Sequence, residues 1–515
     1  MKSAAKVLLF FELPKKLLEN FIISRIKAEL PFIPNEEKDE LFTLLGQFLV
    51  KQTPHKCFLL KGYAGTGKTS VVSALVRALE KLNRPCVLLA PTGRAAKVLA
   101  RYSGYNAFTI HKWIYRRDAF LKETFSLTQN KFVNTLFIVD EASMISVDLL
   151  NDLIRYIYSG EGCSLLLLGD DAQLPPVEMD QSNALVPDYL SGYGLDVTTF
   201  TLTQVARQAL DSGILRNATT LREQLALSPI TYHLSPINYP DFVRITGAQF
   251  QELLEHAYNT DGLEETIILT RSNKRTNLYN NGVRASILWK EDAISNGDRL
   301  MISRNNYFWT RDYDNLPFLA NGDLCEVVRL RNEREMYGFR FADATLRLVD
   351  YDWDVDVVIW IDTLRTDSPD KSYELQRTLF TRIAEDYPEI RNKAELVKLI
   401  RENEYYNALQ IRFAYAVTCH KAQGGQWKHV FIDTGNLLAE QTADTPLTME
   451  EQIANLRWLY TAITRATEMV YLLSLFGTHS VIYRVSIVYL SCIYRLCLGN
   501  DRATVKLCFL KKRIF

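Results

Sequence analysis

The strongest chemical signal in the sequence is a glycine-rich loop that ends in a lysine and two hydroxyls. The segment GYAGTGKTS (residues 62–70) fits the pattern G-x-x-x-x-G-K-[ST], follows the apolar run CFLL and precedes the helical stretch VVSALVRALE. Backbone N–H groups of such a loop can wrap phosphates, the Lys68 side chain can reach the β and γ oxygens, and the Thr69 hydroxyl can ligate Mg²⁺. The expected phosphate-binding residues are Gly62, Tyr63, Ala64, Gly65, Thr66, Gly67, Lys68, Thr69 and Ser70.

Two later apolar runs also end in polar residues that suit phosphate chemistry. FIVDEAS (137–143) places Asp140 where it could hold Mg²⁺ through water, and Glu141 where it could polarise an attacking water. In LLLLGDDAQLPPV (165–177) the amide of Gln173 could sense a γ-phosphate, while Asp170 and Asp171 fit a turn equally well. These residues predict a nucleoside triphosphatase, with Thr69 and Asp140 as metal ligands.

Two arginines in distinctive stretches are candidates for completing this site. Arg207 lies in LTQVARQ and Arg465 in YTAITRAT, both far along the chain from the glycine-rich loop. Hydrolysis needs positive charge on the γ-phosphate, and arginines supplied across a cleft provide it only when the cleft closes. A single arginine is more often a surface ion-pair residue, so the prediction depends on both arginines lying within such recognisable stretches.

The elements that must position these residues form two similar sets. CFLLKG, PCVLLAP, TLFIVDEA and SLLLLGD are short continuous apolar runs separated by helical stretches, and ETIILTRSN, FAYAVTCHK, HVFIDTG and MVYLLSL form a second set. This pattern is typical of parallel sheets buried on both faces, whose ligands bind at the carboxyl ends of the strands. We therefore expect an α/β fold of two units, preceded by two helices in residues 18–50.

Two insertions interrupt these units. Residues 300–370 contain alternating apolar and polar stretches (DLCEVVRL, YGFRFADATLRLV and YDWDVDVVIWID), which predict a small antiparallel β-barrel, and residues 371–410 return to a helical pattern. The segment FSLTQNKFV suggests a β-hairpin that turns at Gln129–Asn130. Its length permits a pin between about 115 and 132 and no larger domain.

Composition limits the classes of function. A chain of 515 residues is too long for one hydrophobic core, and its 47% apolar and 23% charged residues are those of a globular protein. Sixty basic residues balance sixty acidic ones, so a polyanion would have to be held by a local groove. Eight cysteines without a repeated C-x-x-C spacing favour reduced thiols in the cytoplasm and disfavour zinc. No stretch reaches the roughly 18 apolar residues of a membrane span, and Glu12 interrupts the short apolar run near the start.

The order of the motifs carries a more specific resemblance. In chain order the segments are GYAGTGKTS, APTGRAAKVL, TIHKWIY, FIVDEASMIS, GDDAQLPPV, LTQVARQ, AVTCHKAQGGQW and YTAITRAT. The series spans about residues 20–475 and resembles the motif set of superfamily one DNA helicases of the RecD-like and Dda-like branch. The resemblance implies two RecA-like P-loop domains with ATP between them, a pin in the first, an SH3-like barrel in the second and 5′-to-3′ movement on single-stranded DNA.

The resemblance also implies roles for individual residues. ATP and Mg²⁺ would be the cofactors, with catalysis by Lys68, Asp140, Glu141, Gln173, Arg207 and Arg465 and further nucleotide contacts from Gly424 and Gln426. DNA contacts would come from Pro91, Thr92, Gly93, His111, Thr418 and His420, although helix capping is a common alternative role for residues such as Thr92. Two segments depart from the family: Glu37 and Lys38 stand where an adenine-reading glutamine is expected, and Gln426 replaces a common glutamate.

These observations predict the following organisation: an extension at 1–17, a first RecA-like domain at 18–200, a second at 201–475 and an atypical tail at 476–515 without an assigned function. We expect a monomeric cytoplasmic enzyme that moves along single-stranded DNA and unwinds duplex DNA. It would work with replication, repair or recombination proteins and have no membrane partner. The alternative is a nucleic-acid-stimulated ATPase that remodels protein–DNA or RNA complexes without separating strands. A nuclease is disfavoured because no separate cluster of acids with a lysine is present, and a non-catalytic binding module because the catalytic residues are intact.

Overall fold

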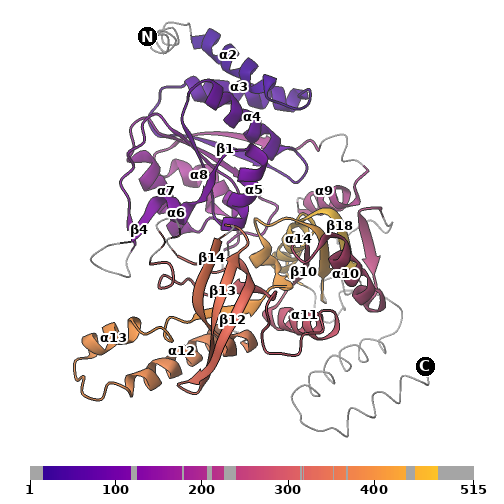
Figure 1. Cartoon of the computed structure of the whole chain (residues 1–515). Helices are drawn as coiled ribbons and strands as arrows, with labels where there is room; N and C mark the ends of the chain where they lie inside the picture. The colour runs from indigo at the N-terminus through magenta and orange to yellow at the C-terminus, as the bar shows by residue number, and fades with distance from the viewer. Residues whose placement is uncertain are drawn as a thin grey trace.

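The computed structural model describes residues 15–117, 125–176, 179–205, 211–225, 239–351, 353–366, 369–435 and 447–473, apart from 312, 314, 315 and 317. Two α/β domains and a barrel are arranged as Figure 1 shows, with the barrel and two helices extending below the first domain. The expected N-terminal extension lies mostly outside the described residues, as do the tail after residue 475 and Arg207.

The first domain is built on a six-stranded sheet in the order β3-β2-β6-β7-β1-β8, with every neighbouring pair parallel. Four of these strands are the apolar runs expected from the sequence, and the outer strands β3 and β8 were missed. The strands are β1 (Lys56–Gly62), β2 (Cys86–Ala90), β3 (Ala107–Thr109), β6 (Leu136–Val139), β7 (Ser164–Gly169) and β8 (Asp196–Leu202).

Helices cover both faces of this sheet and bury it in two apolar clusters. One face packs against α2 (Lys15–Ala28), α3 (Glu36–Val50), α4 (Lys68–Lys81) and α5 (Gly93–Ser103). The other packs against α6 (Ile110–Ile114), α7 (Val147–Tyr158) and α8 (Pro187–Ser191), with short 3-10 turns at Ala142–Met144 and Asn183–Leu185. Burial on both faces explains why these strands read as continuous apolar runs.

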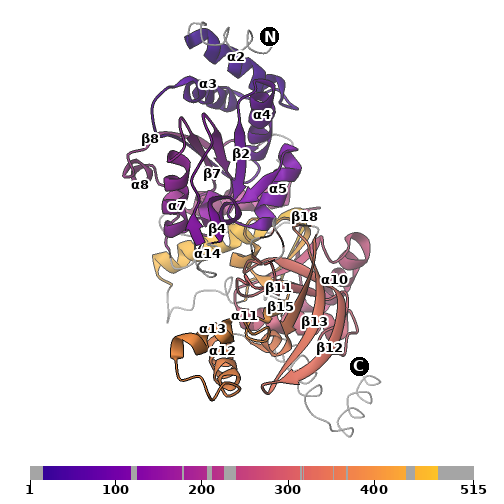
Figure 2. The ribbon, with the colours of Figure 1, turned by 60° about the vertical axis from the view of Figure 1, so that its left-hand side comes forward.

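The second domain has a five-stranded sheet in the order β16-β10-β17-β18-β9, again parallel throughout. Its strands are β9 (Phe242–Ile245), β10 (Thr266–Thr270), β16 (Ala416–Thr418), β17 (Trp427–Asp433) and β18 (Ala466–Leu473). Its helices are α9 (Gly213–Leu225), α10 (Gly247–Asp261), α11 (Asn273–Ser286) and α14 (Met449–Ile463), with a 3-10 turn η5 at Cys419–Ala422. In Figure 2, α14 lies directly beneath the first domain.

A closed five-stranded barrel interrupts the second domain. It consists of β11 (Arg299–Ile302), β12 (Leu324–Met336), β13 (Phe339–Leu348), β14 (Trp353–Trp360) and β15 (Leu409–Phe413). The three central strands are those expected from alternation, whereas β11 and β15 close the barrel from either side of the helical segment. Between β14 and β15 lie η4 (Ile361–Arg365), α12 (Pro369–Ala384) and α13 (Lys393–Arg401).

The expected hairpin in the first domain is present, but its turn is not where the sequence placed it. Strand β4 (Tyr115–Arg117) pairs antiparallel with β5 (Phe125–Leu127), so the connection falls between residues 118 and 124, outside the described residues. The predicted turn at Gln129–Asn130 is wrong because Asn130 is buried and anchors the chain instead. Its side-chain Nδ2 donates to the Ile157 carbonyl at 3.0 Å, and its Oδ1 accepts from the Phe132 amide at 2.9 Å.

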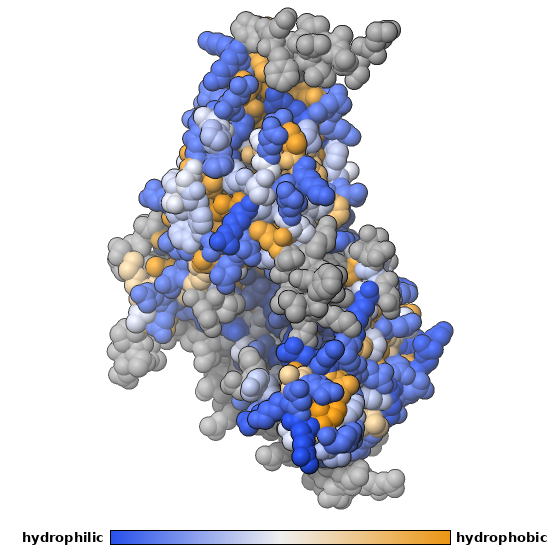
Figure 3. All heavy atoms as spheres, turned by 90° about the vertical axis from the view of Figure 1, so that its left-hand side faces the viewer, coloured by the Kyte–Doolittle hydropathy of each residue, from blue (hydrophilic) through white to orange (hydrophobic). Residues whose placement is uncertain are grey.

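Figure 3 shows one face of the molecule coloured by hydropathy. Hydrophilic side chains dominate this face, and the apolar patches are small and separated. Among the helices of the described chain, none combines the length and apolar character needed to cross a bilayer. The cysteines that the structure describes, at positions 57, 86, 163, 325 and 419, are free thiols.

Candidate nucleotide site between the two domains

The glycine-rich loop connects the carboxyl end of β1 to the first turn of α4, as the sequence predicted. Gly65 and Gly67 have φ angles of 75° and 89°, which favour glycine, and Gly67 immediately precedes the helix. The Thr66 hydroxyl, fully buried, donates to the Tyr63 carbonyl at 2.8 Å and tightens the loop. Lys68 Nζ donates to the carbonyl oxygens of Gly62 and Tyr63, so the ammonium lies inside the loop.

The two acids Asp140 and Glu141 directly follow the core strand β6. Glu141 adopts a left-handed conformation (φ 52°) and its amide donates to Asp140 Oδ1 at 2.8 Å. Burial and the nearby Glu141 charge raise the pKa of Asp140 from 3.8 to about 6, against the opposing effects of the Glu141 amide and of the positive charges of Lys68 and Arg465. A neighbouring cation stabilises the charged form of such a buried carboxylate and so lowers its pKa.

This donor set fits Mg²⁺. Thr69 stands in the first turn of α4 next to Lys68, and Asp140 ends the neighbouring core strand β6. No group of three or more His, Cys, Asp or Glu side chains that could hold a metal occurs among the described residues. Mg²⁺ is commonly bound through one or two protein ligands together with phosphates and waters. Thr69 and Asp140 could therefore hold the ion together with a bound nucleotide.

Arg465 of the second domain reaches into this site. It is 3% exposed and its Nη1 lies 3.6 Å from Glu141 Oε1. The same guanidinium is held from behind by the Thr461 carbonyl (from Nε, 3.3 Å) and the Gly425 carbonyl (from Nη1, 3.3 Å). A buried arginine from the second domain thus faces the expected catalytic carboxylate of the first, which is the arrangement expected for an arginine supplied across a cleft.

The loop after β7 connects the two domains through a tyrosine that the sequence did not single out. Tyr460 on α14 is buried, donates its hydroxyl to Asp170 Oδ2 at 2.6 Å and accepts from the Ala64 amide at 2.9 Å. Asp170 Oδ1 also accepts from the Ala172 amide at 3.0 Å, so this carboxylate both stabilises its loop and contacts the second domain. Asp171 pairs instead with Lys61 at 3.4 Å.

Two further hydrogen bonds cross the same interface. The Leu174 amide donates to Thr461 Oγ1 at 2.9 Å, and Gln423 Nε2 donates to the Leu174 carbonyl at 2.7 Å. Gln173, between Asp170 and Leu174, is 7% exposed. Tyr460, Thr461 and Gln423 all lie within quoted motifs, but spacing alone could not show which of their side chains cross the interface.

The residues expected to contact DNA end neighbouring strands. Ala90 pairs with Thr109, so the segments after β2 and β3, which contain Pro91, Thr92, Gly93 and His111, lie side by side. The Thr92 hydroxyl caps α5 by accepting from the Ala95 amide at 3.2 Å, which is the alternative role considered for it. The His111 ring lies 6.2 Å from the Phe318 ring of the barrel insertion, and burial lowers its pKa.

The segment 417–426 packs on the start of α5. Gly424 has φ 73°, and a Cβ there would lie 2.8 Å from Ala95 Cβ and 3.0 Å from Thr92 Oγ1. Gln426 contacts Tyr102 of α5, whose hydroxyl lies 3.2 Å from Gln426 Oε1. Thr418 ends β16 and His420 lies on the following 3-10 turn η5. The expected nucleotide contacts Gly424 and Gln426 are therefore placed against the helix that carries the expected DNA contacts.

Arg94 joins three parts of the molecule at this point. Its Nη2 donates to the Gln426 carbonyl at 3.0 Å, its guanidinium lies 4.8 Å from the Trp427 ring, and its Nη1 lies 3.7 Å from Asp350 Oδ1 in the barrel. Sequence reasoning missed this residue, although it lies in the quoted segment PTGRAAK. Arg94 therefore connects α5, the segment 417–426 and the turn after β13.

The positions that depart from the family pattern have structural partners. Glu37 Oε1 accepts from the Thr203 amide and hydroxyl, both at 2.7 Å, and so ties α3 to the end of β8. Lys38 is 5% exposed, burial lowers its pKa, and its Cε lies 3.5 Å from the Cβ position of Gly67 in the phosphate loop. Asn35 Nδ2 donates to Gln204 Oε1 at 2.7 Å nearby. The glutamine amide in this region therefore belongs to Gln204, just after β8, and not to the segment before the phosphate loop where the family pattern expects it.

Two family descriptions match the chain. Residues 49–230 match the AAA domain, and residues 413–473 match the UvrD-like helicase C-terminal domain. The first match contains the phosphate loop and both acids, and the second contains Gly424, Gln426 and Arg465. The composite site described above is therefore shared between the two matched regions.

Several proteins are similar in sequence. An uncharacterised protein, R530, of Acanthamoeba polyphaga mimivirus is 23% identical over 507 residues, covering 81% of this chain and 95% of R530. The ATP-dependent RecD2 DNA helicase of Deinococcus radiodurans is 32% identical over 187 residues, or 36% of this chain and 24% of RecD2. The ATP-dependent DNA helicase Dda of Enterobacteria phage T4 is 24% identical over 299 residues, or 54% of this chain and 64% of Dda.

The chain thus spans less than two thirds of the length of these two named helicases. A solved structure of Pif1 helicases at forked duplex DNA aligns with 89% of this chain and 98% of that chain, with a TM-score of 0.45 and 16% identity. The ordered motifs, the two domain matches and the partial matches to RecD2 and Dda show that this chain resembles superfamily one helicases of the RecD-like and Dda-like branch.

Proposed function

We propose that the chain is an ATP-dependent DNA helicase that moves along single-stranded DNA in the 5′-to-3′ direction and couples ATP hydrolysis to duplex unwinding. The observation that carries this proposal is the approach of Arg465 from the second domain to Glu141 of the first, 3.6 Å apart. Because the site needs groups from both domains, nucleotide binding and domain closure are linked, and linked closure is the basis of a translocating motor.

Hydrolysis would use the residues in the roles that their positions allow. Glu141 accepts a proton from a water whose oxygen attacks the γ-phosphorus, the bond from that phosphorus to the β–γ bridging oxygen breaks, and ADP leaves with the electron pair. Lys68 and Arg465 stabilise the negative charge on the phosphate oxygens. Mg²⁺, when bound by Thr69 and Asp140, supplies further positive charge to those oxygens. Arg207 would add a second arginine from the segment 202–208.

Motion would pass from this site to the strand through α5. Arg465 contacts the Gly425 carbonyl, and the neighbouring Gly424 packs on α5 at Thr92. A change in the position of Arg465 on ATP binding would therefore move the segment that contacts the expected DNA-binding end of α5. Hydroxyl, imidazole and backbone N–H groups at Thr92, His111 and Thr418 suit phosphates of a passing strand, since such contacts carry no base information.

The two insertions would allow an ATPase that moves along DNA to separate the strands of a duplex. The hairpin of β4 and β5 would act as the pin that splits the duplex, and the closed barrel would be the SH3-like insertion that holds the strand against it. The ring contact between His111 and Phe318 supports this assignment, because it brings the barrel insertion to the helix that precedes the hairpin. Work in the cytoplasm as a monomer with DNA repair or recombination proteins belongs to the same proposal.

The decisive experiment measures ATP turnover and strand separation on duplexes with a 5′ or a 3′ overhang, in DNA and in RNA. We expect DNA-stimulated hydrolysis and unwinding only from the 5′ overhang. Lys68→Ala should abolish both activities while the circular dichroism spectrum and the unfolding temperature are retained. Full hydrolysis in that variant would contradict the assigned site.

Deleting the hairpin distinguishes the helicase from the alternative function. The helicase should lose unwinding but keep DNA-stimulated hydrolysis in a variant that joins Tyr115 to Leu127 by a short glycine linker. An ATPase that remodels protein–DNA or RNA complexes would show no unwinding before the deletion, and would still displace a bound protein from DNA after it.

A further inference from the structure

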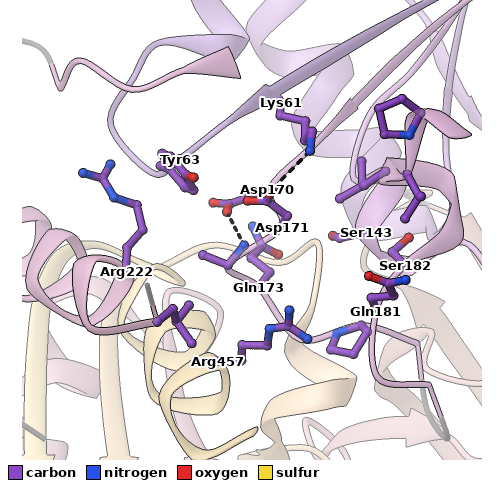
Figure 4. A pocket seen from close by; sticks show the side chains of 16 residues that line it. Lys61, Tyr63, Ser143, Asp170, Asp171, Gln173, Gln181, Ser182, Arg222 and Arg457 are labelled. Carbon is purple, nitrogen blue, oxygen red and sulfur yellow. Dashed lines mark hydrogen bonds and ion pairs between the residues drawn. The ribbon is translucent and has the colours of Figure 1, made fainter. Parts of the chain in front are cut away.

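A cavity of about 410 Å³ lies beside the phosphate loop, between the two domains. The cavity is lined from both sides, by Lys61, Tyr63, Ser143 and Gln173 of the first domain and by Arg222 and Arg457 of the second. In Figure 4, Arg222 lies at the edge of this group, beside Tyr63. Tyr63 and Gln173 are shared with the expected nucleotide site, whereas Lys68, Thr69, Asp140 and Glu141 do not line the cavity. The cavity therefore adjoins the expected γ-phosphate position without being the site of hydrolysis.

The cavity wall contains buried polar atoms that have no hydrogen-bond partner within the described part of the chain. These atoms are Ser143 Oγ, Gln173 Oε1, Arg222 Nη1 and Arg457 Nε. Ser143 is 1% exposed and Gln173 is 7% exposed, so neither side chain is satisfied by bulk solvent. Leaving a buried polar group unpaired costs about 1–3 kcal/mol. Four such atoms at one cavity indicate a polar ligand.

The charges at the cavity favour an anion. Arg457 lines it from α14 and donates Nη1 to the Asp180 carbonyl, and no carboxylate among the described residues accepts a hydrogen bond from it. Arg222 stacks on Tyr63, 4.3 Å from its ring, and its nearest described carboxylate is that of the exposed Glu223, 3.8 Å away.

The two acids in the wall have their own partners. Asp170 accepts hydrogen bonds from Tyr460 and the Ala172 amide, and Asp171 pairs with Lys61. Lys61, Arg222 and Arg457 thus bring three positive charges to the wall against the two carboxylates of Asp170 and Asp171, although the charges of Asp171 and Asp180 also act on Arg457. An anion at this position would balance the excess of positive over negative side chains in the wall.

We propose that this cavity binds the inorganic phosphate cleaved from ATP and holds it before release. The inference rests on the proposed ATPase function. Arg222, Arg457 and the Ser143 hydroxyl would donate to phosphate oxygens, while Gln173 Oε1 would accept from the P–OH of hydrogen phosphate, so that each unpaired atom gains a partner. A water occupies about 30 Å³ in the liquid, so the volume accommodates the ion with several waters.

This role would connect product release to domain opening. Arg222 and Arg457 belong to the second domain, whereas Ser143 and Gln173 belong to the first. A phosphate bound by both domains would stabilise the closed arrangement, and its departure would remove that stabilisation. The proposal therefore predicts that added phosphate inhibits turnover and that this inhibition depends on residues outside the hydrolysis site.

The test measures phosphate binding to the full chain saturated with ADP, by isothermal titration calorimetry at constant ionic strength. Arg457→Gln should weaken phosphate binding roughly tenfold, as expected for the loss of a hydrogen bond from a charged group, and Ser143→Ala should weaken it less. Arg457→Lys, which keeps the charge, should recover part of the affinity. Arg77→Gln is the matched control, because Arg77 is exposed on α4 and does not line the cavity.

The second readout is inhibition of DNA-stimulated hydrolysis by added phosphate. Half-maximal inhibition should require roughly ten times more phosphate in Arg457→Gln than in the unsubstituted chain or Arg77→Gln. ADP affinity measured with each variant shows that the fold is intact. Equal phosphate affinity in Arg457→Gln and the unsubstituted chain would overturn the proposal, as would the absence of any phosphate binding.

A Lys68→Ala variant separates the cavity from the phosphate loop. Phosphate binding that survives Lys68→Ala but not Arg457→Gln supports the cavity. Binding lost in Lys68→Ala and retained in Arg457→Gln places the anion in the loop and contradicts the proposal. Failure of the ATPase proposal is recognised independently, because the unsubstituted chain would then release no phosphate from ATP, whatever its affinity for added phosphate.

Discussion

Tyr460 provides the sharpest test of how the two domains communicate. Its hydroxyl donates to Asp170 Oδ2 at 2.6 Å and accepts from the Ala64 amide at 2.9 Å, and the side chain is 1% exposed. Tyr460→Phe removes both bonds with almost no change in shape. It leaves the phosphate-loop amide and one carboxylate oxygen without these partners in a buried interface.

The size of the effect follows from the nature of the lost bonds. A hydrogen bond to a charged group contributes about 1.5–3 kcal/mol, and about 2 kcal/mol corresponds to a roughly 30-fold change in an equilibrium. Because Tyr460 and its partners belong to different domains, this change applies to the closure equilibrium. If ATP binds productively only to the closed form, its apparent affinity falls with the closed population. We expect the KM for ATP in DNA-stimulated hydrolysis to rise roughly tenfold or more.

The chain offers a matched control in Tyr415. Its hydroxyl donates to Asp298 Oδ1 at 2.8 Å and accepts from the Arg299 amide at 3.3 Å, and all three residues belong to the second domain and its barrel. Tyr415→Phe therefore removes the same two kinds of hydrogen bond without touching the interface between the domains.

Steady-state hydrolysis over a range of ATP concentrations and chemical unfolding would be measured for both variants. Both should lower the free energy of unfolding, but only Tyr460→Phe should raise the KM for ATP. An unchanged KM in Tyr460→Phe, or an equal rise in Tyr415→Phe, would refute the reasoning that Tyr460 couples the domains.

Three further predictions concern other parts of the fold. Burial raises the pKa of Asp323 from 3.8 to about 7, so the folded state binds this proton more tightly than the unfolded state does. The free energy of unfolding should therefore fall by up to about 4 kcal/mol as pH rises from 4 to 7. In urea titrations, Asp323→Asn should flatten this dependence on pH. Gly424→Ala places a Cβ 2.8 Å from Ala95 Cβ at φ 73° and should reduce the stimulation of hydrolysis by single-stranded DNA, with Gly104→Ala, also at positive φ but with open space around it, as the control for backbone strain. Arg94→Gln should lower the unfolding free energy by about 1–3 kcal/mol because it removes the ion-pair partner of the buried Asp350 carboxylate and leaves only the charges of Lys97 and Arg299 near it. Adding Asp350→Asn should restore part of that loss, and no restoration would show that the two side chains are not coupled.

The hairpin shows where prediction from sequence stopped. The sequence indicated an insertion of the right length, but Gln129–Asn130 has turn-forming character that the fold does not use. Asn130 is instead buried against Ile157 of α7, a contact between residues 27 positions apart. Local preference for a turn is weak, and a buried amide that satisfies a carbonyl outweighs it.

The barrel shows a second limit. Alternation identified β12, β13 and β14, which are long and half-exposed, whereas β11 and β15 are short and buried. Ile302 pairs with Ile411 across 109 residues that include the other three strands and the two helices of the insertion. Closure of a barrel requires pairing between its first and last strands, and no local pattern encodes a pairing over that separation.

The sequence by itself determined the chemistry of each half-site. The glycine-rich loop follows β1 and precedes α4, and the two acids follow β6, as the sequence indicated, because short local segments specify such turns. The tertiary structure alone decided which groups meet across the interface: Tyr460 with Ala64 and Asp170, Arg94 with Asp350, and the arginines that face the cavity. These contacts join residues up to 396 positions apart, and only the packing of the two domains against each other can bring them together.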